Sequence, residues 1–282
     1  MLSQHPVSLF SGILFMNSVW ELLKISLKWS LRDRAFHAIL GTAVLALFFI
    51  PVFSTFSMRQ VQEMSITLAL SAVSLVLLVI ATISGASSIW RDVEKKYIVS
   101  VLGLPISRTS YLLAKFFGNA LTLLLCAVVL GAFSSLAIVV SSSQYPSEVP
   151  IRWMNISAAV LTDSMKYVLL AAFGLLFSSL STSFFLPLFG TVGIFLAGTA
   201  SQSVYEYISG DYGKQMPKIF SIALKGLYYI LPNFSAFDIK VQAIYGLPLS
   251  WSGVALTTIY FAVYSSALLF FAQWIFVRRQ LG

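Results

Sequence analysis

The chain has 282 residues, of which 58% are hydrophobic and only 10% are charged, and its mean hydropathy is +0.88. This composition excludes an ordinary soluble domain, in which roughly a quarter of the residues are charged. Because the apolar residues follow one another instead of alternating with polar ones, a membrane β-barrel is disfavoured. The sequence therefore predicts an all-α membrane protein with a single domain, residues 1–282.

The formal net charge of +8 is also compatible with nucleic-acid binding. The basic residues lie beside the apolar runs, however, where they fit the anionic headgroups of a bilayer. We therefore expect the lipid bilayer and no nucleic acid as a partner. The single cysteine, Cys126, lies inside an apolar run, so the chain offers no internal disulfide.

Residues 16–34 form the first predicted element, an amphipathic helix. Polar and apolar side chains recur at spacings of three and four on opposite faces. Trp20, Trp29 and a basic edge are typical of a helix that lies along the cytoplasmic surface of a membrane. A helix packed on other parts of the protein is the alternative interpretation.

Five apolar runs are long enough to cross a bilayer, which takes about 20 residues per helix, and one of them is long enough for two crossings. The predicted spans are residues 37–56, 67–90, 116–140, two spans that share 167–205, and 252–276. The serine-rich stretch 178–183 predicts the turn between the fourth and fifth spans.

Residues 202–250 are more polar, and Lys225 and Pro232 interrupt their apolar part. We predict an outer re-entrant or interfacial helical segment before the last span, and residues 219–237 could also form a crossing. The positive-inside rule places both termini and the charged stretch 88–115 in the cytoplasm, because these parts together carry more Lys and Arg than the other side. An inner bacterial membrane is the expected location.

Two ionisable residues stand at the start of the predicted fourth span, just before its uncharged run: Asp163 and Lys166, which are three positions apart and share one helix face. Buried charges in a membrane are costly and often functional, so the pair is a candidate part of a conduit or gate. An ion pair at the interfacial start of the helix is an equally reasonable interpretation.

Motifs for catalysis are not evident in the sequence. It contains no glycine-rich loop ending in Gly-Lys-Ser/Thr, so we expect no ATP bound by this chain. The two histidines, His5 and His37, have no partner at a spacing suited to haem or metal. We expect no cofactor, no metal site and no enzymatic activity in this chain alone.

The charged stretch 88–115 links the second and third spans and is where a soluble partner could act on the embedded protein. Within it, Gly103 and Pro105 predict a turn after a helix that continues out of the membrane. We predict that a soluble partner contacts this stretch. The candidate coupling residues are Asp92, Glu94, Lys95, Lys96, Leu104, Pro105, Ser107 and Arg108.

The same stretch resembles the permease subunits of type-2 ABC exporters, in particular the branch of multi-copper enzyme maturation permeases. The matching residues are Glu94, Leu102, Pro105, Ile106, Ser107, Arg108, Leu112, Leu113 and Lys115. Ala114 stands where that family often has glycine and Tyr97 where it often has threonine, which leaves the substrate branch open. The motif covers about 25 residues, whereas the six-span plan covers nearly the whole chain.

The resemblance implies that two permease copies or paralogues assemble with two separate ABC ATPase subunits, which hold ATP and Mg. It also implies that residues 93–108 form a coupling helix and that the outer helices form an external gate. A non-transporting membrane scaffold or anchor of an assembly or maturation complex is the alternative. A secondary transporter is disfavoured, because inverted repeats are not evident.

Overall fold

The computed structural model describes residues 7–57, 60–95, 107–144, 149–210 and 217–278. These residues form helices and connecting turns, with no β-strand among them. In the described part of the chain, five helices are long and apolar enough to cross a membrane, and a bent helix pair makes a sixth candidate. The predicted all-α membrane protein is therefore confirmed.

The bundle is built from long helices joined by short connections. In chain order, the helices are α1 (Val7–Arg32), α2 (Arg34–Phe48), α3 (Ile50–Ser54), α4 (Val61–Glu94), α6 (Arg108–Gln144), α7 (Trp153–Leu180), α8 (Phe185–Ser209), α9 (Lys218–Ile230), α10 (Lys240–Ile244) and α11 (Trp251–Arg278). Two short 3₁₀ helices, Thr55–Ser57 and Phe234–Phe237, lie between them.

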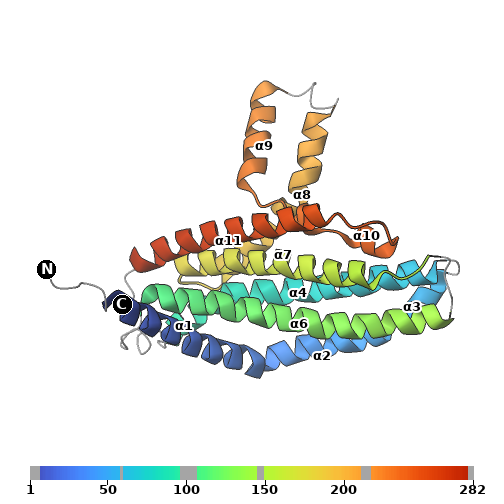
Figure 1. Ribbon diagram of the computed structural model, residues 1–282. Coiled ribbons are helices and arrows are strands. Elements are labelled where there is room, and N and C mark those ends of the chain that lie inside the picture. The colour runs from blue at the N-terminus through green and yellow to red at the C-terminus, as the bar shows by residue number, and fades with distance from the viewer. Residues whose placement is uncertain (1–6, 58–59, 96–106, 145–148, 211–216, 279–282) are drawn as a thin grey trace.

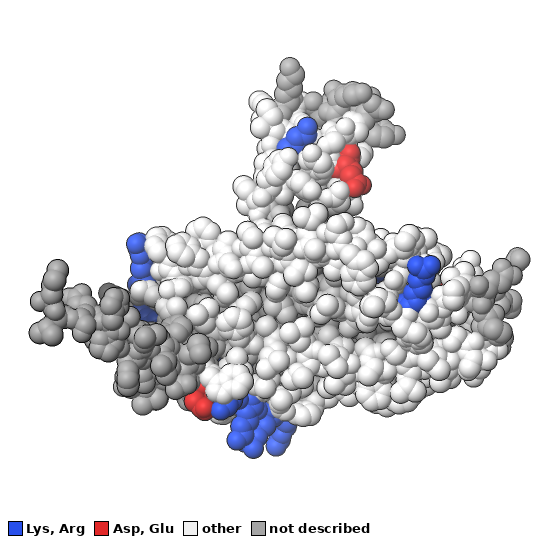
Figure 2. Space-filling model, viewed as in Figure 1, with Lys and Arg blue, Asp and Glu red and all other residues white. Residues whose placement is uncertain are grey.

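Helices α4, α6, α7 and α11 run side by side along the long axis of the bundle, with α2 continuing the line of α1 along one edge (Figure 1). The 34 residues of α4 give a helix of about 51 Å, which is longer than a bilayer core of about 30 Å. On the face seen in Figure 2, charged side chains gather near the bundle ends, over α1 and on the projection, and the middle is free of them. The length of α4 suits a bundle whose long axis crosses the membrane, whereas the charges over α1 and on the projection lie partway along that axis (Figure 2).

Two glycines allow a close backbone contact between α4 and α7. A Cβ atom added to Gly174 would lie 2.8 Å from the carbonyl carbon of Gly85, and one added to Gly85 would lie 2.9 Å from the carbonyl oxygen of Ala171. Small residues allow membrane helices to pack with their backbones in contact, because lipid gives no hydrophobic drive for association. The pair therefore joins α4 and α7 as one unit.

The first predicted span, residues 37–56, is not one continuous helix. α2 and α3 meet at Phe49 with a bend of 41°. Pro51 lies in the first turn of α3, and because proline has no backbone N–H it cannot continue the hydrogen bonding of α2. The proline explains why the helix breaks here.

The helix α7 begins much earlier than the predicted fourth span. It starts at Trp153, so Asp163 and Lys166 lie well inside it rather than at its start. The predicted turn at 178–183 is confirmed, because α7 ends at Leu180 and α8 begins at Phe185. The Ser181 hydroxyl accepts a hydrogen bond from the Ser183 N–H at 3.0 Å and stabilises this turn.

The segment before the last span forms a projection that we call the arm, made of the C-terminal part of α8 and of α9. It stands across the long axis of the bundle (Figure 1). Its two helices are joined by stacked rings of Tyr205 and Tyr228, 4.3 Å apart, and by a hydrogen bond from Tyr228 to Gln202. With 13 residues, α9 alone is too short to cross a bilayer.

Candidate functional site

The candidate site lies where the end of α4 and the start of α6 come together, on either side of residues 96–106. Lys96, Leu104 and Pro105 lie outside the described residues. Among the other candidates, Glu94, Lys95 and Ser107 are exposed at the surface, whereas Asp92 and Arg108 are partly buried. The two groups have different environments and different contacts.

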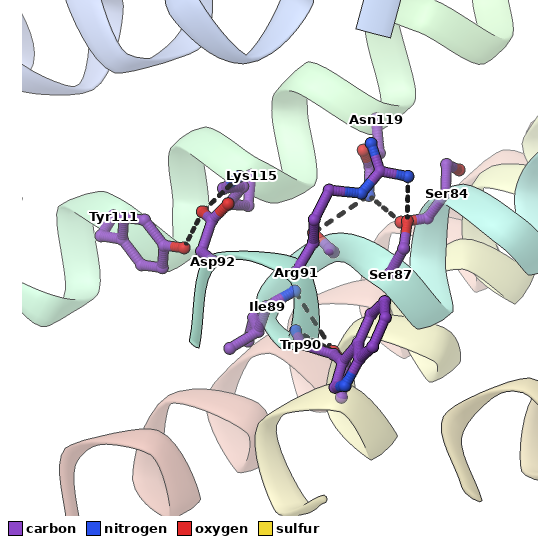
Figure 3. Close-up of polar contacts among 11 residues, drawn as sticks. Ser84, Ser87, Ile89, Trp90, Arg91, Asp92, Tyr111, Lys115 and Asn119 are labelled. Atoms are coloured by element: carbon purple, nitrogen blue, oxygen red, sulfur yellow. Dashed lines mark hydrogen bonds and ion pairs between the residues drawn. The ribbon is translucent and has the colours of Figure 1, made fainter. Parts of the chain in front are cut away.

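Asp92 is the centre of a polar cluster that ties α4 to α6 (Figure 3). Its carboxylate forms an ion pair of 2.7 Å with the Lys115 ammonium and accepts a hydrogen bond from the Tyr111 hydroxyl. The Asp92 side chain is only 13% exposed. Because ion pairs are stronger when water is partly excluded, this cluster fixes the end of α4 against the first turns of α6.

The neighbouring residue, Arg91, makes a different set of contacts. Its Nη1 atom donates to a carboxylate oxygen of Asp33 at 3.0 Å, and its Nη2 atom lies 3.5 Å from the Ser87 hydroxyl. Asp33 sits between α1 and α2. The end of α4 is therefore also connected to the junction of the amphipathic helix and the first span.

Arg108 and Ser107 define the start of α6. The Ser107 hydroxyl accepts a hydrogen bond from the Ser110 N–H at 3.0 Å, which is the geometry of a helix N-cap. Arg108 donates to the carbonyl of Val277 at 2.9 Å, at the end of α11. A cation at a helix C-terminus satisfies carbonyls that have no partner within the helix and complements the helix dipole. The start of α6 is thus attached to the last turn of α11.

The opposite face of α4 contacts the end of α7. The Ser178 hydroxyl accepts hydrogen bonds from the N–H groups of Ile89 and Trp90 at 3.2 and 3.0 Å. The Trp90 ring lies 5.1 Å from that of Phe184, just before α8.

We call the set of contacts around residues 89–92, 107–115 and 276–277 the junction, because it joins α1/α2, α4, α6, α7 and α11.

The second candidate site, Asp163 and Lys166, is separate from the junction. The two side chains form an ion pair with each other and are 3% and 7% exposed. The Lys166 ammonium also lies over the ring of Tyr167, whose hydroxyl is 2.7 Å from that of Ser74 on α4. A polar cluster therefore lies inside the bundle, between α7 and α4.

Sequence reasoning missed the roles of Asp33, Arg91, Tyr111 and Lys115 in the junction. Asp33 and Arg91 are 58 positions apart, so no local spacing connects them. The sequence did offer one indication of these contacts. Two acidic and two basic residues border apolar runs at the same predicted membrane face: Asp33, Asp92, Arg91 and Lys115. Ionisable groups in such positions are expected to pair with one another.

The junction connects its helices through ion pairs and hydrogen bonds. Among the described residues, no group of three His, Cys, Asp or Glu side chains is placed to hold a metal ion.

A comparison with known protein families found no family that matches the chain, and a comparison with curated proteins found no similar sequence.

Proposed function

We propose that the chain is the membrane permease subunit of an ATP-driven exporter of the type-2 ABC class. A separate ATPase subunit would bind ATP and Mg and contact residues 93–108, with that side in the cytoplasm. Movement of this contact would then be transmitted to the membrane helices and open a path between them. The motif that resembles the family and the membrane-spanning helices support this proposal.

The junction is the observation that carries the proposal. Asp92 links α4 to α6, and Arg108 links α6 to α11. Ser178 adds α7, and Asp33 adds the start of α2. A force on the segment between α4 and α6 would therefore reach most of the bundle at once, as a rigid-body movement of packed helices requires.

Glu94 and Lys95 are the described residues best placed for a direct contact with the ATPase, because both are exposed at the end of α4. Replacing Glu94 by lysine should lower ATP-dependent transport and weaken ATPase association, because it reverses a charge at the proposed contact. About tenfold weaker association is expected if the charge pairs with the partner, since a charge reversal adds repulsion. The measurement is co-purification with the cognate ATPase, followed by ATPase assays in proteoliposomes.

Arg152→Glu is the matched control, because Arg152 is an exposed charge that precedes α7 at the other end of the bundle. It should leave association and ATP turnover unchanged. Full association and activity of Glu94→Lys and of Lys95→Glu would contradict a contact at this surface. Insertion of all three variants is checked by their yield in membranes.

A second copy or a paralogue is the second partner in the proposal, and the arm supports it. Ile219, Ile222 and Ile230 on α9 are between 71% and 81% exposed. The arm also carries Glu206 and Lys225, which lipid tails would not solvate. Protein from another subunit could cover both kinds of side chain.

Replacing Ile219 and Ile222 together by serine should therefore shift the purified protein from dimer to monomer. The change removes apolar area that the second subunit would bury, at about 25 cal/mol per Å². Leu256→Ser with Ile259→Ser on α11 is the control, since these side chains are 67% and 59% exposed but lie outside the arm. Native mass spectrometry measures the oligomeric state, and an unchanged dimer in the arm variant would contradict the prediction.

A further inference from the structure

A cavity of about 490 Å³ lies beside the junction, between α1, α2, α4 and α6. Its volume falls in the range of small-molecule sites, roughly 300 to 1,000 Å³. It overlaps the proposed ATPase contact at Lys95 only, because its other walls are the sides of the helices rather than their exposed ends. The walls differ in chemistry from one end of the cavity to the other.

The wall formed by α4 changes from apolar to charged along a single face. Its lining residues recur at helical spacing, and in order they are Ile80, Ile83, Ser84, Ser87, Ser88, Arg91, Asp92 and Lys95. Ile80 and Lys95 are fifteen positions apart, which corresponds to about 22 Å along the helix axis. One face of α4 therefore offers three zones in order. The apolar zone is Ile80 and Ile83, the hydroxyl zone is Ser84, Ser87 and Ser88, and the charged zone is Arg91, Asp92 and Lys95.

The facing walls mix apolar and polar side chains. Leu22, Phe36 and Ile39 from α1 and α2 are apolar, whereas Asp33 between these helices is charged. On α6, Asn119 lines the cavity one turn further into the bundle than Lys115, which stands at the charged end of the α4 wall. An occupant that matches the α4 wall must therefore be apolar at one end and charged at the other.

The hydroxyl zone contains polar atoms that are poorly satisfied. The Ser84 hydroxyl is buried and has no hydrogen-bond partner among the described residues. The Asn119 amide reaches the Ser84 carbonyl and the Ser88 hydroxyl only at 3.4 Å, which is long for a hydrogen bond (Figure 3). Buried polar groups normally have a partner, so this zone suits a ligand with oxygen acceptors at mid-length.

The charged zone has an excess of cations. Arg91, Lys95 and Lys115 face Asp33 and Asp92 at the mouth of the cavity. The contacts with Asp33 and Ser87 use two of the five N–H groups of the Arg91 guanidinium. An anionic group at this mouth would be attracted, and a phosphate could accept several of these donors.

We propose that this cavity binds an anionic phospholipid. One acyl chain would lie against Ile80 and Ile83, the ester region beside Ser84, and the phosphate near Arg91 and Lys95. A soluble anion would make no contact with the apolar zone, and a neutral apolar molecule would make no ionic contact with the cations. The inference does not depend on an ATPase partner, so it can fail or succeed independently of the proposed function.

The test compares phosphatidylglycerol with phosphatidylcholine of the same acyl chains, using native mass spectrometry of the full-length protein in detergent. The wild-type chain should bind one phosphatidylglycerol about tenfold more tightly than phosphatidylcholine. Lys95→Gln should weaken phosphatidylglycerol binding about fivefold and leave phosphatidylcholine unchanged, because one cation near the headgroup is removed. Lys95 is exposed, so this variant should fold normally.

Ile83→Trp should weaken binding of both lipids, because the larger side chain fills the apolar zone. Leu75→Trp is its control, since Leu75 is 63% exposed on the same helix and does not line the cavity. Equal binding of the two lipids by the wild-type chain would overturn the proposal. So would equal competition by glycerophosphoglycerol, which carries the same headgroup without acyl chains, or unchanged lipid binding in Ile83→Trp.

Discussion

Alanine substitution should have opposite effects at two membrane-helix glycines, Gly174 on α7 and Gly193 on α8. At Gly174 the new Cβ would meet backbone atoms of Gly85 at 2.8 and 2.9 Å, so α4 and α7 must separate. Overpacking of this kind costs about 1 to 3 kcal/mol. A Cβ at Gly193 meets nothing within 4 Å, and the better helix propensity of alanine adds up to about 1 kcal/mol.

The measurement is thermal stability of the two variants in detergent, followed by fluorescence-detected size exclusion. Gly174→Ala should melt several degrees below the wild-type protein, and Gly174→Leu should lose the monodisperse peak. Gly193→Ala should melt at or above the wild-type temperature. Equal melting temperatures for the two alanine variants would mean that α4 and α7 are not in backbone contact.

This contact matters for function because α4 connects the two candidate sites. One end of α4 carries Asp92 and Arg91 in the junction, and Ser74 further along the helix contacts Tyr167 beside Lys166. Since α4 and α7 touch at Gly85 and Gly174 between these points, they would move together. Packed cores of this kind switch between discrete arrangements rather than deform continuously.

Much of the fold followed from local patterns in the sequence. Apolar runs longer than 20 residues predicted most of the long helices, and the serines at 178–183 predicted the turn before α8. The break at Phe49 was missed, although Pro51 was a sufficient signal for it. The early start of α7 was missed because neighbouring helices bury its polar residues, and that burial depends on the tertiary structure.

The site was harder to predict than the fold. The sequence identified Asp92 and Arg108 as candidate residues. It predicted that they contact a partner protein, and it did not predict their contacts within this chain. Arg108 and Val277 are 169 positions apart, and the backbone carbonyl that accepts the hydrogen bond has no signature in the sequence. The contact between Gly85 and Gly174 is equally hidden, because nothing in their local sequence separates them from the other glycines.

The ion pair inside α7 gives the other large predicted effect. Replacing Asp163 by leucine would leave the Lys166 ammonium, which is 7% exposed, without its carboxylate partner. Breaking a buried pair in this way costs about 3 to 5 kcal/mol. Lys166→Met should be similarly destabilising, because it leaves the Asp163 carboxylate buried alone.

The double variant Asp163→Leu/Lys166→Met separates a structural role from a role in transport. Replacing both partners of a buried pair by apolar residues is often neutral or stabilising, so the double variant should recover the wild-type melting temperature. If the pair lines a conduit or gate, transport should remain low although the protein is folded and still binds its ATPase. Recovery of both stability and transport would show that the pair serves only to hold α7 in place, because the polar side chains would then be dispensable for the path through the membrane.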